Sequence, residues 1–171
     1  MHDSARARFG YHIRHHPPRD ITDLPDESRA YRATPGPVSG ISNAVEVAAT
    51  FDTALVRLST GEIYAWGSNG GRALGNGTQN TYGNNSVSVP SQKNPQPVTG
   101  ITTATKVVAG YNSAYAILSD GTSRAWGDNS NGHLGDNTTT NQSTPIVLNL
   151  GQALKGFTSR PTWTTMHFIT A

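Results

Sequence analysis

The sequence predicts an all-β protein built from repeated units of short antiparallel strands. Three observations predict it: charged residues make up only 14% of the 171 residues, 18 glycines punctuate the chain, and one stretch recurs at a fixed offset. A helical protein normally carries more charge on its exposed faces. Abundant glycine, asparagine, serine and threonine with scattered β-branched residues is typical of short strands joined by tight turns.

The recurrence is an internal duplication. Residues 37–78 and 97–138 align without a gap at an offset of 60, and 18 of the 42 pairs are identical. Such identities are expected where the backbone is unusual or the side chain is buried, because those positions have few substitutes. The identical pairs include Pro37/Pro97, Gly61/Gly121, Ala65/Ala125, Trp66/Trp126, Gly67/Gly127, Asn69/Asn129 and Leu74/Leu134. The chain therefore contains two copies of one structural unit.

Each copy is expected to form three strands in sequence and a fourth, shorter one. The first strands are "VEVAAT" (45–50) and "TKVVAG" (105–110), which are rich in β-branched residues. "TALVRLS" and "SAYAILS" follow, and "GEIYAWG" and "GTSRAWG" come third. "STGE" (59–62) and "SDGT" (119–122) are hairpin signals, because glycine tolerates the positive φ of such turns. We place the fourth strand at the start of "PVSGI", "PVTGI" and "PIVLNL".

The segment after each Trp-Gly pair is predicted to be an irregular connection. Leu74 or Leu134 would anchor it. We expect Trp66 and Trp126 to fill the core between neighbouring units, and Gly67 and Gly127 to let another backbone approach closely. Four short antiparallel strands per unit are typical of a β-propeller blade.

The remaining segments have their own expectations. Residues 1–33 are predicted to be a disordered or non-native leader, and residues 34–150 hold the two repeats, the start of a third and an insert loop at 79–96. A third unit with the shorter spacer 139–144 would place its Trp near residue 174, and Trp163 is out of register. Residues 151–171 are therefore predicted to be a truncated or degenerate third repeat.

The repeated pattern "L-S-x-G-x-x-x-A-W-G-x-N", with "P-V-x-G-I" upstream and "L-G-[ND]-x-T" downstream, resembles the repeat of the regulator-of-chromosome-condensation family. The "AWG" form, with Ala65 and Ala125, looks like the cysteine-free repeat of bacterial members. The resemblance implies blades of a seven-bladed β-propeller, here an incomplete ring, because two and a fraction units cannot close one. The founding member of that family is a guanine-nucleotide exchange factor for the small GTPase Ran.

The resemblance implies a protein-interaction scaffold with a protein partner of unknown identity and no enzymatic activity. Two alternatives stay open: an exchange regulator of a small GTPase, and a secreted or cell-surface structural repeat protein. Open blade edges would allow self-association. No apolar run is long enough for a signal peptide or a membrane span, so a cytoplasmic location is the default and secretion would require an incomplete N-terminus.

Charge and cysteine content exclude several functions. Six of the ten arginines and four of the six histidines lie in residues 1–32, together with five acids, so the net charge of +2 does not describe a basic nucleic-acid-binding face. The chain has no cysteine, and thiolate chemistry and disulfides are therefore impossible. Nucleic acid is an improbable partner even for "RARFGYHIRHHPPR", where acids follow at once.

The remaining candidate sites are weak, and we expect no catalytic residue, cofactor or metal. His12, His15, His16 and Asp20 lie in a proline-interrupted stretch without a regular geometry, which favours a mobile tail over a metal site. Asp128, Asn129, Asn131 and Asp136 resemble an oxygen-rich calcium loop but lack its bidentate acid, and turn chemistry explains them better. "NGGRALGNG" (69–77) lacks the Gly-Lys-Ser/Thr of a phosphate loop. His133 and His167 are the only histidines beyond residue 32, and no catalytic triad can be assembled from them.

Overall fold

The computed structural model describes residues 37–79, 92–149, 151, 154–159 and 166–170. These residues form strands and turns with no helix, which confirms the all-β prediction. The predicted leader 1–33, with its histidines, and Trp163 lie outside the described residues.

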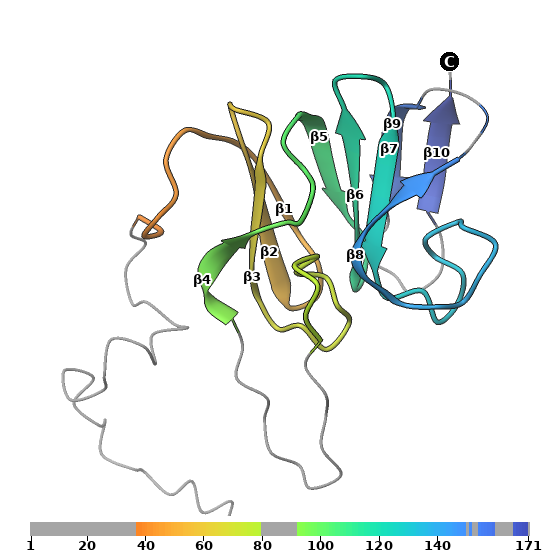
Figure 1. The fold of residues 1–171 in the computed structure, drawn as a ribbon, viewed down its shortest axis with the longest axis horizontal. Coiled ribbons are helices and arrows are strands. Elements are labelled where there is room, and N and C mark those ends of the chain that lie inside the picture. Colours follow the sequence, from red (N-terminus) through yellow and green to blue (C-terminus); the bar gives the residue numbers. More distant parts are fainter. Residues whose placement is uncertain (1–36, 80–91, 150, 152–153, 160–165, 171) are drawn as a thin grey trace, which may run out of the picture. The chain divides into compact units, whose positions relative to one another are not determined.

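Two four-stranded antiparallel sheets make up the main body, and each follows chain order (Figure 1). We call the first sheet blade 1 and the second blade 2. Blade 1 consists of β1 (Ala44–Ala49), β2 (Thr53–Leu58), β3 (Ile63–Gly67) and β4 (Gln92–Pro97). Blade 2 consists of β5 (Ala104–Ala109), β6 (Ser113–Leu118), β7 (Ser123–Gly127) and β8 (Gln142–Leu148). The first three strands of each blade lie where the sequence predicted them.

The fourth strand lies earlier than predicted. β4 ends at Pro97, so the prediction of a loop through residue 96 is wrong for residues 92–96. The Val98 amide donates a last bond to the Ile63 carbonyl (2.8 Å), and the chain then turns at Gly100, whose φ is +72°. Residues 37–41 likewise form a turn and no strand. β4 pairs only with β3, and an edge strand tolerates the prolines that obscured it in the sequence.

Residues beyond blade 2 form a two-stranded antiparallel sheet, β9 (Leu154–Ser159) with β10 (Met166–Thr170). Its register repeats that of the first two strands of each blade. In β1–β2 the register shifts between Ala44 and Glu46, and in β5–β6 it shifts between Ala104 and Lys106. In the third sheet Thr170 pairs with Leu154 while Ile169 pairs with Gly156, which is the same shift. The bulge gives this third sheet the same construction as the starts of blades 1 and 2.

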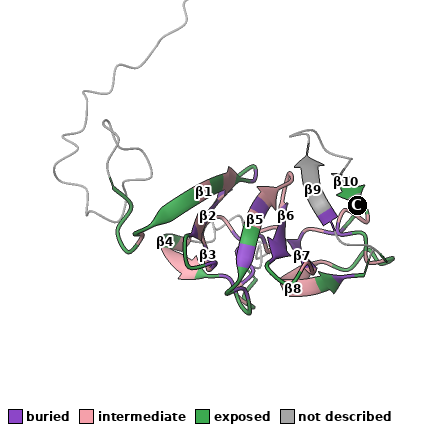
Figure 2. Ribbon diagram, turned by 90° about the horizontal axis from the view of Figure 1, so that it is seen from above, coloured by how far each residue is buried: buried purple, intermediate pink, exposed green. Residues whose placement is uncertain are grey.

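The core lies between the sheets. One cluster joins Leu55, Ile63, Leu74 and Val98 of blade 1 to one face of blade 2, where Trp126 is completely buried. A second cluster joins the other face of blade 2, including Tyr115 and Leu134, to Leu154 of β9. Figure 2 shows the result: β6 is buried along its length and β1 is largely exposed.

Gly67 and Gly127 allow a close backbone approach, as the sequence predicted. A Cβ on Gly127, whose φ is +105°, would lie 2.4 Å from the Asn112 carbonyl oxygen; on Gly67 (φ +120°) it would lie 2.4 Å from the Asp52 carbonyl oxygen. The third strand of each blade therefore ends directly against the turn between the first and second strands of the same blade.

We predict that Gly127→Ala destabilises the protein by more than about 3 kcal/mol, because strain at positive φ and a backbone collision add. Gly100→Ala is the matched control: its φ is +72°, and no atom lies within 4 Å of the added Cβ. That variant should lose only about 1–2 kcal/mol, the strain term alone. Urea unfolding monitored by circular dichroism measures both. Equal losses of unfolding free energy in the two variants would show that the collision with the Asn112 carbonyl adds nothing to the backbone strain.

Candidate interaction surface

The loops after β3 and β7 are held by a buried asparagine. The Asn69 side chain accepts a hydrogen bond from the Leu74 amide (3.2 Å) and donates to the carbonyl and hydroxyl oxygens of Thr78 (3.0 Å each). Asn129 makes the same bonds to Leu134 (2.8 Å) and to Thr138 (3.0 and 3.2 Å). Both asparagines are at most 1% exposed. The repeated asparagine, Leu-Gly and threonine of the motif are thus one clamp that fixes the loop.

The hydrogen bonds of this loop also account for the oxygen-rich residues of 128–136. Asp128 accepts bonds from the Ser130 amide and hydroxyl, and Asp136 accepts bonds from Thr138 and from the Asn129 amide group (2.9 Å). Asn131 is exposed. The Asp128 and Asp136 side chains thus accept bonds from residues two positions along the chain, as in turns, and the Asn129 side chain belongs to the clamp. Within the described part of the chain, no three acidic or histidine side chains lie together as metal ligands.

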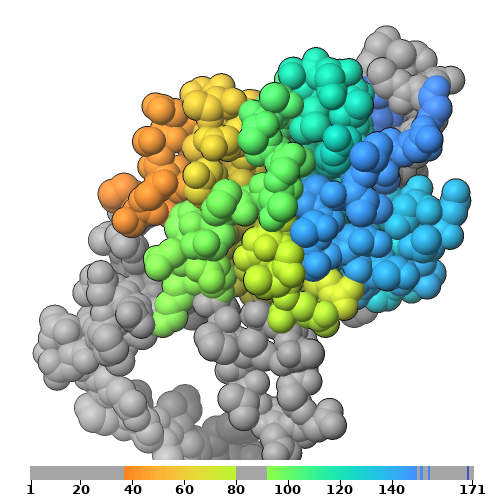
Figure 3. Space-filling view, in the orientation of Figure 1, coloured from red at the N-terminus to blue at the C-terminus, as the bar shows by residue number. Residues whose placement is uncertain are grey.

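The loop 68–79 also forms the seat on which blade 2 packs. Trp126 donates its indole N–H to the Ala73 carbonyl (2.9 Å) across the blade boundary. A Cβ on Gly75 would lie 2.7 Å from the indole nitrogen, so the glycine makes room for the ring. Arg72 reaches further, donating to the Asn141 carbonyl (2.6 Å), and the Gly77 amide donates to the Ser143 carbonyl (2.9 Å). In Figure 3 this loop lies against the start of β8. Residues 69–77 are therefore a blade connection.

The two tryptophans do not share one environment, which corrects the sequence prediction for Trp66. Trp126 fills the boundary between blades, but Trp66 is only half-buried. The described residues include no blade that packs against the face of blade 1 carrying Trp66. The Trp66 ring therefore has no counterpart of the loop that receives Trp126, and no described residue accepts a bond from its indole N–H. The same difference affects Val47, which is 77% exposed where its counterpart Val107 is 3% exposed.

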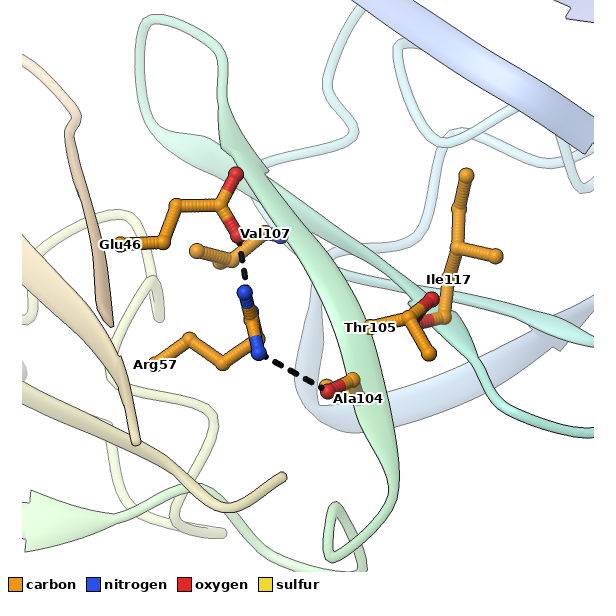
Figure 4. A network of polar contacts seen from close by, with 6 residues as sticks. All are labelled: Glu46, Arg57, Ala104, Thr105, Val107 and Ile117. Atoms are coloured by element: carbon orange, nitrogen blue, oxygen red, sulfur yellow. Dashed lines mark hydrogen bonds and ion pairs between the residues drawn. The ribbon is translucent and has the colours of Figure 1, made fainter. Parts of the chain in front are cut away.

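The blade boundary carries a polar contact that the repeat pattern could not reveal (Figure 4). Glu46 accepts hydrogen bonds from Arg57 (2.8 Å) and from the amide of Val107 on β5 (3.2 Å). Arg57 also donates, at 3.5 Å, to the Ala104 carbonyl. The counterparts of Glu46 and Arg57 in blade 2 are Lys106 and Ile117, so this pair serves one boundary only. It satisfies backbone groups of the edge strand β5.

Blade 2 has its own buried polar group at the opposite boundary. Tyr115 is 1% exposed and donates its hydroxyl to the His133 carbonyl (2.7 Å). Burial raises the pKa of Tyr115 to about 12, against a smaller lowering by its bond with Ser113 and a further raising by Asp128. His133 stands where blade 1 has Ala73, and its carbonyl anchors the loop through Tyr115. His167 lies in β10, and its side chain is outside the described residues.

An aromatic pair bridges the two blades at the end that carries these loops. The Phe51 amide donates to the Tyr111 carbonyl (2.7 Å), and the two ring centroids are 5.2 Å apart at an interplanar angle of 33°. Phe51 is nevertheless 73% exposed. Phe51 lies in the turn before β2 and Tyr111 in the turn before β6, next to the loops that Asn69 and Asn129 hold. A large apolar ring is thus held in place and presented to solvent.

The fold and its boundaries define β-propeller blades that do not close a ring within the described residues. Comparison with known proteins agrees. Models of the regulator of chromosome condensation (RCC1) repeat match residues 60–117 and 104–132. Residues 60–132 of this chain thus match the RCC1 repeat, as the sequence pattern indicated.

Solved structures with the same fold include three informative examples. Prp20p from Saccharomyces cerevisiae, described with its binding to Gsp1p and histones, has a TM-score of 0.62 at 15% identity over 78% of this chain and 33% of that chain. Human WBSCR16 has a TM-score of 0.59 at 20% identity, covering 78% and 32%. Yeast RCC1 (Prp20) bound to Kap60 has a TM-score of 0.56 at 20% identity, covering 71% and 27%. The chain spans about a third of the length of these proteins.

We predict that exchanging the charges at the blade boundary, Glu46→Arg with Arg57→Glu, fails to restore stability. An arginine cannot accept from the Val107 amide, and a glutamate cannot donate to the Ala104 carbonyl. The double variant should remain about 1–2 kcal/mol less stable than the wild type in urea unfolding, as Glu46→Ala does. Faster hydrogen exchange of the Val107 amide should accompany the loss. Full recovery of stability in the double variant would show that the contact acts as an ion pair and that its bonds to the backbone contribute nothing.

A second prediction concerns Asp136. Burial alone would raise its pKa, but hydrogen bonds from Thr138 and Asn129 bring the pKa below the ordinary value. A carboxylate with a lowered folded-state pKa contributes stability that is present above its unfolded pKa of about 4 and is lost as pH falls through the folded pKa.

Asp136→Asn should therefore be close to neutral at pH 7, because Asn76 already accepts the equivalent bonds in blade 1 (3.1 and 2.6 Å). It should also remove part of the wild type's loss of stability below about pH 4. Urea midpoints across an acid pH series measure both. Asp136→Ala, which has no acceptor, should be destabilised at neutral pH; identical acid slopes in wild type and Asp136→Asn would contradict the assignment.

Proposed function

We propose that the chain is a protein-interaction module without enzymatic activity, whose contact surface is the end of the blades that carries Phe51 and Tyr111. The observation that carries the proposal is the exposed Phe51 ring, held by the Tyr111 carbonyl and stacked near the Tyr111 ring. Aromatic residues on a rigid frame dominate the energetics of protein interfaces, because little side-chain entropy is lost when a partner covers them. The RCC1-type fold supports the proposal by analogy, since Prp20p is described with protein partners.

The surroundings of the ring support a protein partner over a small ligand. One clamped loop lies next to the aromatic pair, because the Asp128 amide donates to the carbonyl of Asn112, the residue after Tyr111 (2.9 Å), and the Asp128 side chain accepts from Ser130. An aromatic centre with a polar rim is the usual composition of a protein interface. Small-molecule sites, in contrast, are concave and bury most of the ligand.

A photo-crosslinking amino acid placed at position 51 tests the proposal in a lysate of the source cells. Discrete protein adducts are expected at position 51 and not at Val147, an equally apolar position on β8 that is 59% exposed. With the captured partner purified, Phe51→Ala should weaken binding at least about tenfold, while Val147→Ala should leave it unchanged. Equal adducts at both positions, or equal affinities, would refute the assignment of this surface.

The exchange-factor alternative is favoured by one observation, the fold shared with Prp20p, and the chain spans only a third of that protein. Release of fluorescent GDP from a small GTPase of the Ran type separates the two functions. Acceleration by the intact chain would favour exchange activity over a scaffold. A secreted or cell-surface structural protein would instead show no specific adduct at position 51 and would be found outside the cell. In the part of the chain that the structure describes, no helix is long and apolar enough to cross a membrane.

A further inference from the structure

Asparagine is followed by glycine at three places in the chain, and all three lie in the loops after β3 and β7. The pairs are Asn69-Gly70, Asn76-Gly77 and Asn131-Gly132. Asparagine is chemically labile, and a glycine at the next position leaves its own backbone nitrogen open to approach. The glycine nitrogen forms a bond with the side-chain carbonyl carbon of asparagine, the bond from that carbon to the side-chain nitrogen breaks, and ammonia leaves. Water then opens the resulting succinimide ring on either side, which yields aspartate or isoaspartate.

The structure holds two of these pairs in place. Asn69 is 1% exposed, and its side chain makes the three hydrogen bonds of the clamp. The Asn76 side-chain oxygen accepts bonds from the amide and the hydroxyl of Thr78 (3.1 and 2.6 Å). The Gly77 amide, which would have to attack, donates to the Ser143 carbonyl of blade 2 (2.9 Å). Reaction at either pair therefore requires side-chain bonds to break, and at Asn76 also a bond between the blades.

Asn131 lacks these constraints. Its side chain is exposed and makes no hydrogen bond within the part of the chain that the structure describes. A Cβ on Gly132 would meet only the Thr138 carbonyl oxygen, at 3.8 Å, so the space beside the pair is open. The Gly132 amide donates to the Asn129 carbonyl (2.8 Å), and this bond has to open before the nitrogen can attack. It closes a single turn in a surface loop, where local opening costs the least free energy.

We propose that the folded protein undergoes deamidation at Asn131, at least about tenfold faster than at Asn69 or Asn76. The order follows from the bonds that must open, which are one turn bond at Asn131 and the side-chain bonds of the loop framework at the other two pairs. The only co-reactant is water. The inference goes beyond the proposed interaction function and does not depend on it.

The isoaspartate product would add one methylene to the backbone between positions 131 and 132. This place lies inside the segment that the Asn129 side chain closes through the Leu134 amide (2.8 Å). The Tyr115 hydroxyl also bonds within it, to the His133 carbonyl (2.7 Å). Because a lengthened backbone cannot keep the spacing of these bonds, isoaspartate should lower the stability of blade 2. Aspartate leaves the backbone length unchanged and should have little effect.

Incubation of the full chain at mildly alkaline pH, followed by peptide mass spectrometry, measures the rate at each pair. An isoaspartyl methyltransferase with a labelled methyl donor detects isoaspartate separately from aspartate. The modified fraction should rise first at Asn131 in the folded chain, whereas the three pairs should react at similar rates in urea. Equal rates at Asn131 and Asn76 in the folded chain, or no reaction at Asn131 where the unfolded chain reacts, would overturn the proposal.

Substitutions connect the modification to stability. Asn131→Gln should not react, because its longer side chain would have to close a larger, less favourable ring, and its urea midpoint should stay constant during incubation. The wild-type midpoint should fall as isoaspartate accumulates. Asn76→Asp is the matched control, because it keeps the acceptor that Asp136 provides in blade 2, and it should lose stability as the wild type does. An equal loss in Asn131→Gln, or a loss already present in freshly purified Asn131→Asp, would contradict the role of the added methylene.

Discussion

The structure depends on one interaction: a blade of this composition is largely apolar on both faces, so packing of another sheet against a face stabilises it. Burial of such surface contributes about 25 cal/mol per Å², and a lone four-stranded sheet would leave one side in water. Trp126 shows how this packing is made. Its ring fills the boundary between blades, its indole N–H bonds to the Ala73 carbonyl, and Gly75 makes room for it. The blade boundary explains the burial of Trp126 and the glycine at position 75, whereas Gly67 and Gly127 allow a close approach within their own blades.

Covering the faces also determines what the loops can do. The loop that receives Trp126 must hold its shape, and the buried Asn69 holds it through Leu74 and Thr78. Once these loops are fixed, the hairpins beside them become a rigid frame on which Phe51 and Tyr111 can be presented. A packing requirement in the core thus produces an ordered surface at the end of the blades, where rigid scaffolds usually carry binding residues.

Duplication makes the blades alike but leaves them distinguishable. Glu46 and Arg57 bind the edge of β5, whereas the same positions in blade 2 hold Lys106 and Ile117. Tyr115 bonds the His133 carbonyl at a position where blade 1 has Leu55. The Glu46 contact crosses the boundary between the blades, whereas the Tyr115 bond lies within blade 2. Because a buried polar group is costly unless it is paired, the contact of Glu46 and Arg57 with β5 penalises a wrong sheet at that boundary.

The sequence by itself determined the repeat, the first three strands of each blade, their hairpins and the close approach at Gly67 and Gly127, because these follow from local periodicity and backbone preference. It misplaced β4, whose prolines are acceptable only because tertiary pairing makes it an edge strand. It also could not separate Trp66 from Trp126, or show that Glu46 reaches Val107, 61 residues away. Trp66 and Trp126 occupy identical positions of the repeat, so the sequence predicts the same burial for both. Only the tertiary structure decides which copy is covered, because burial depends on the neighbouring sheet and not on the residue itself.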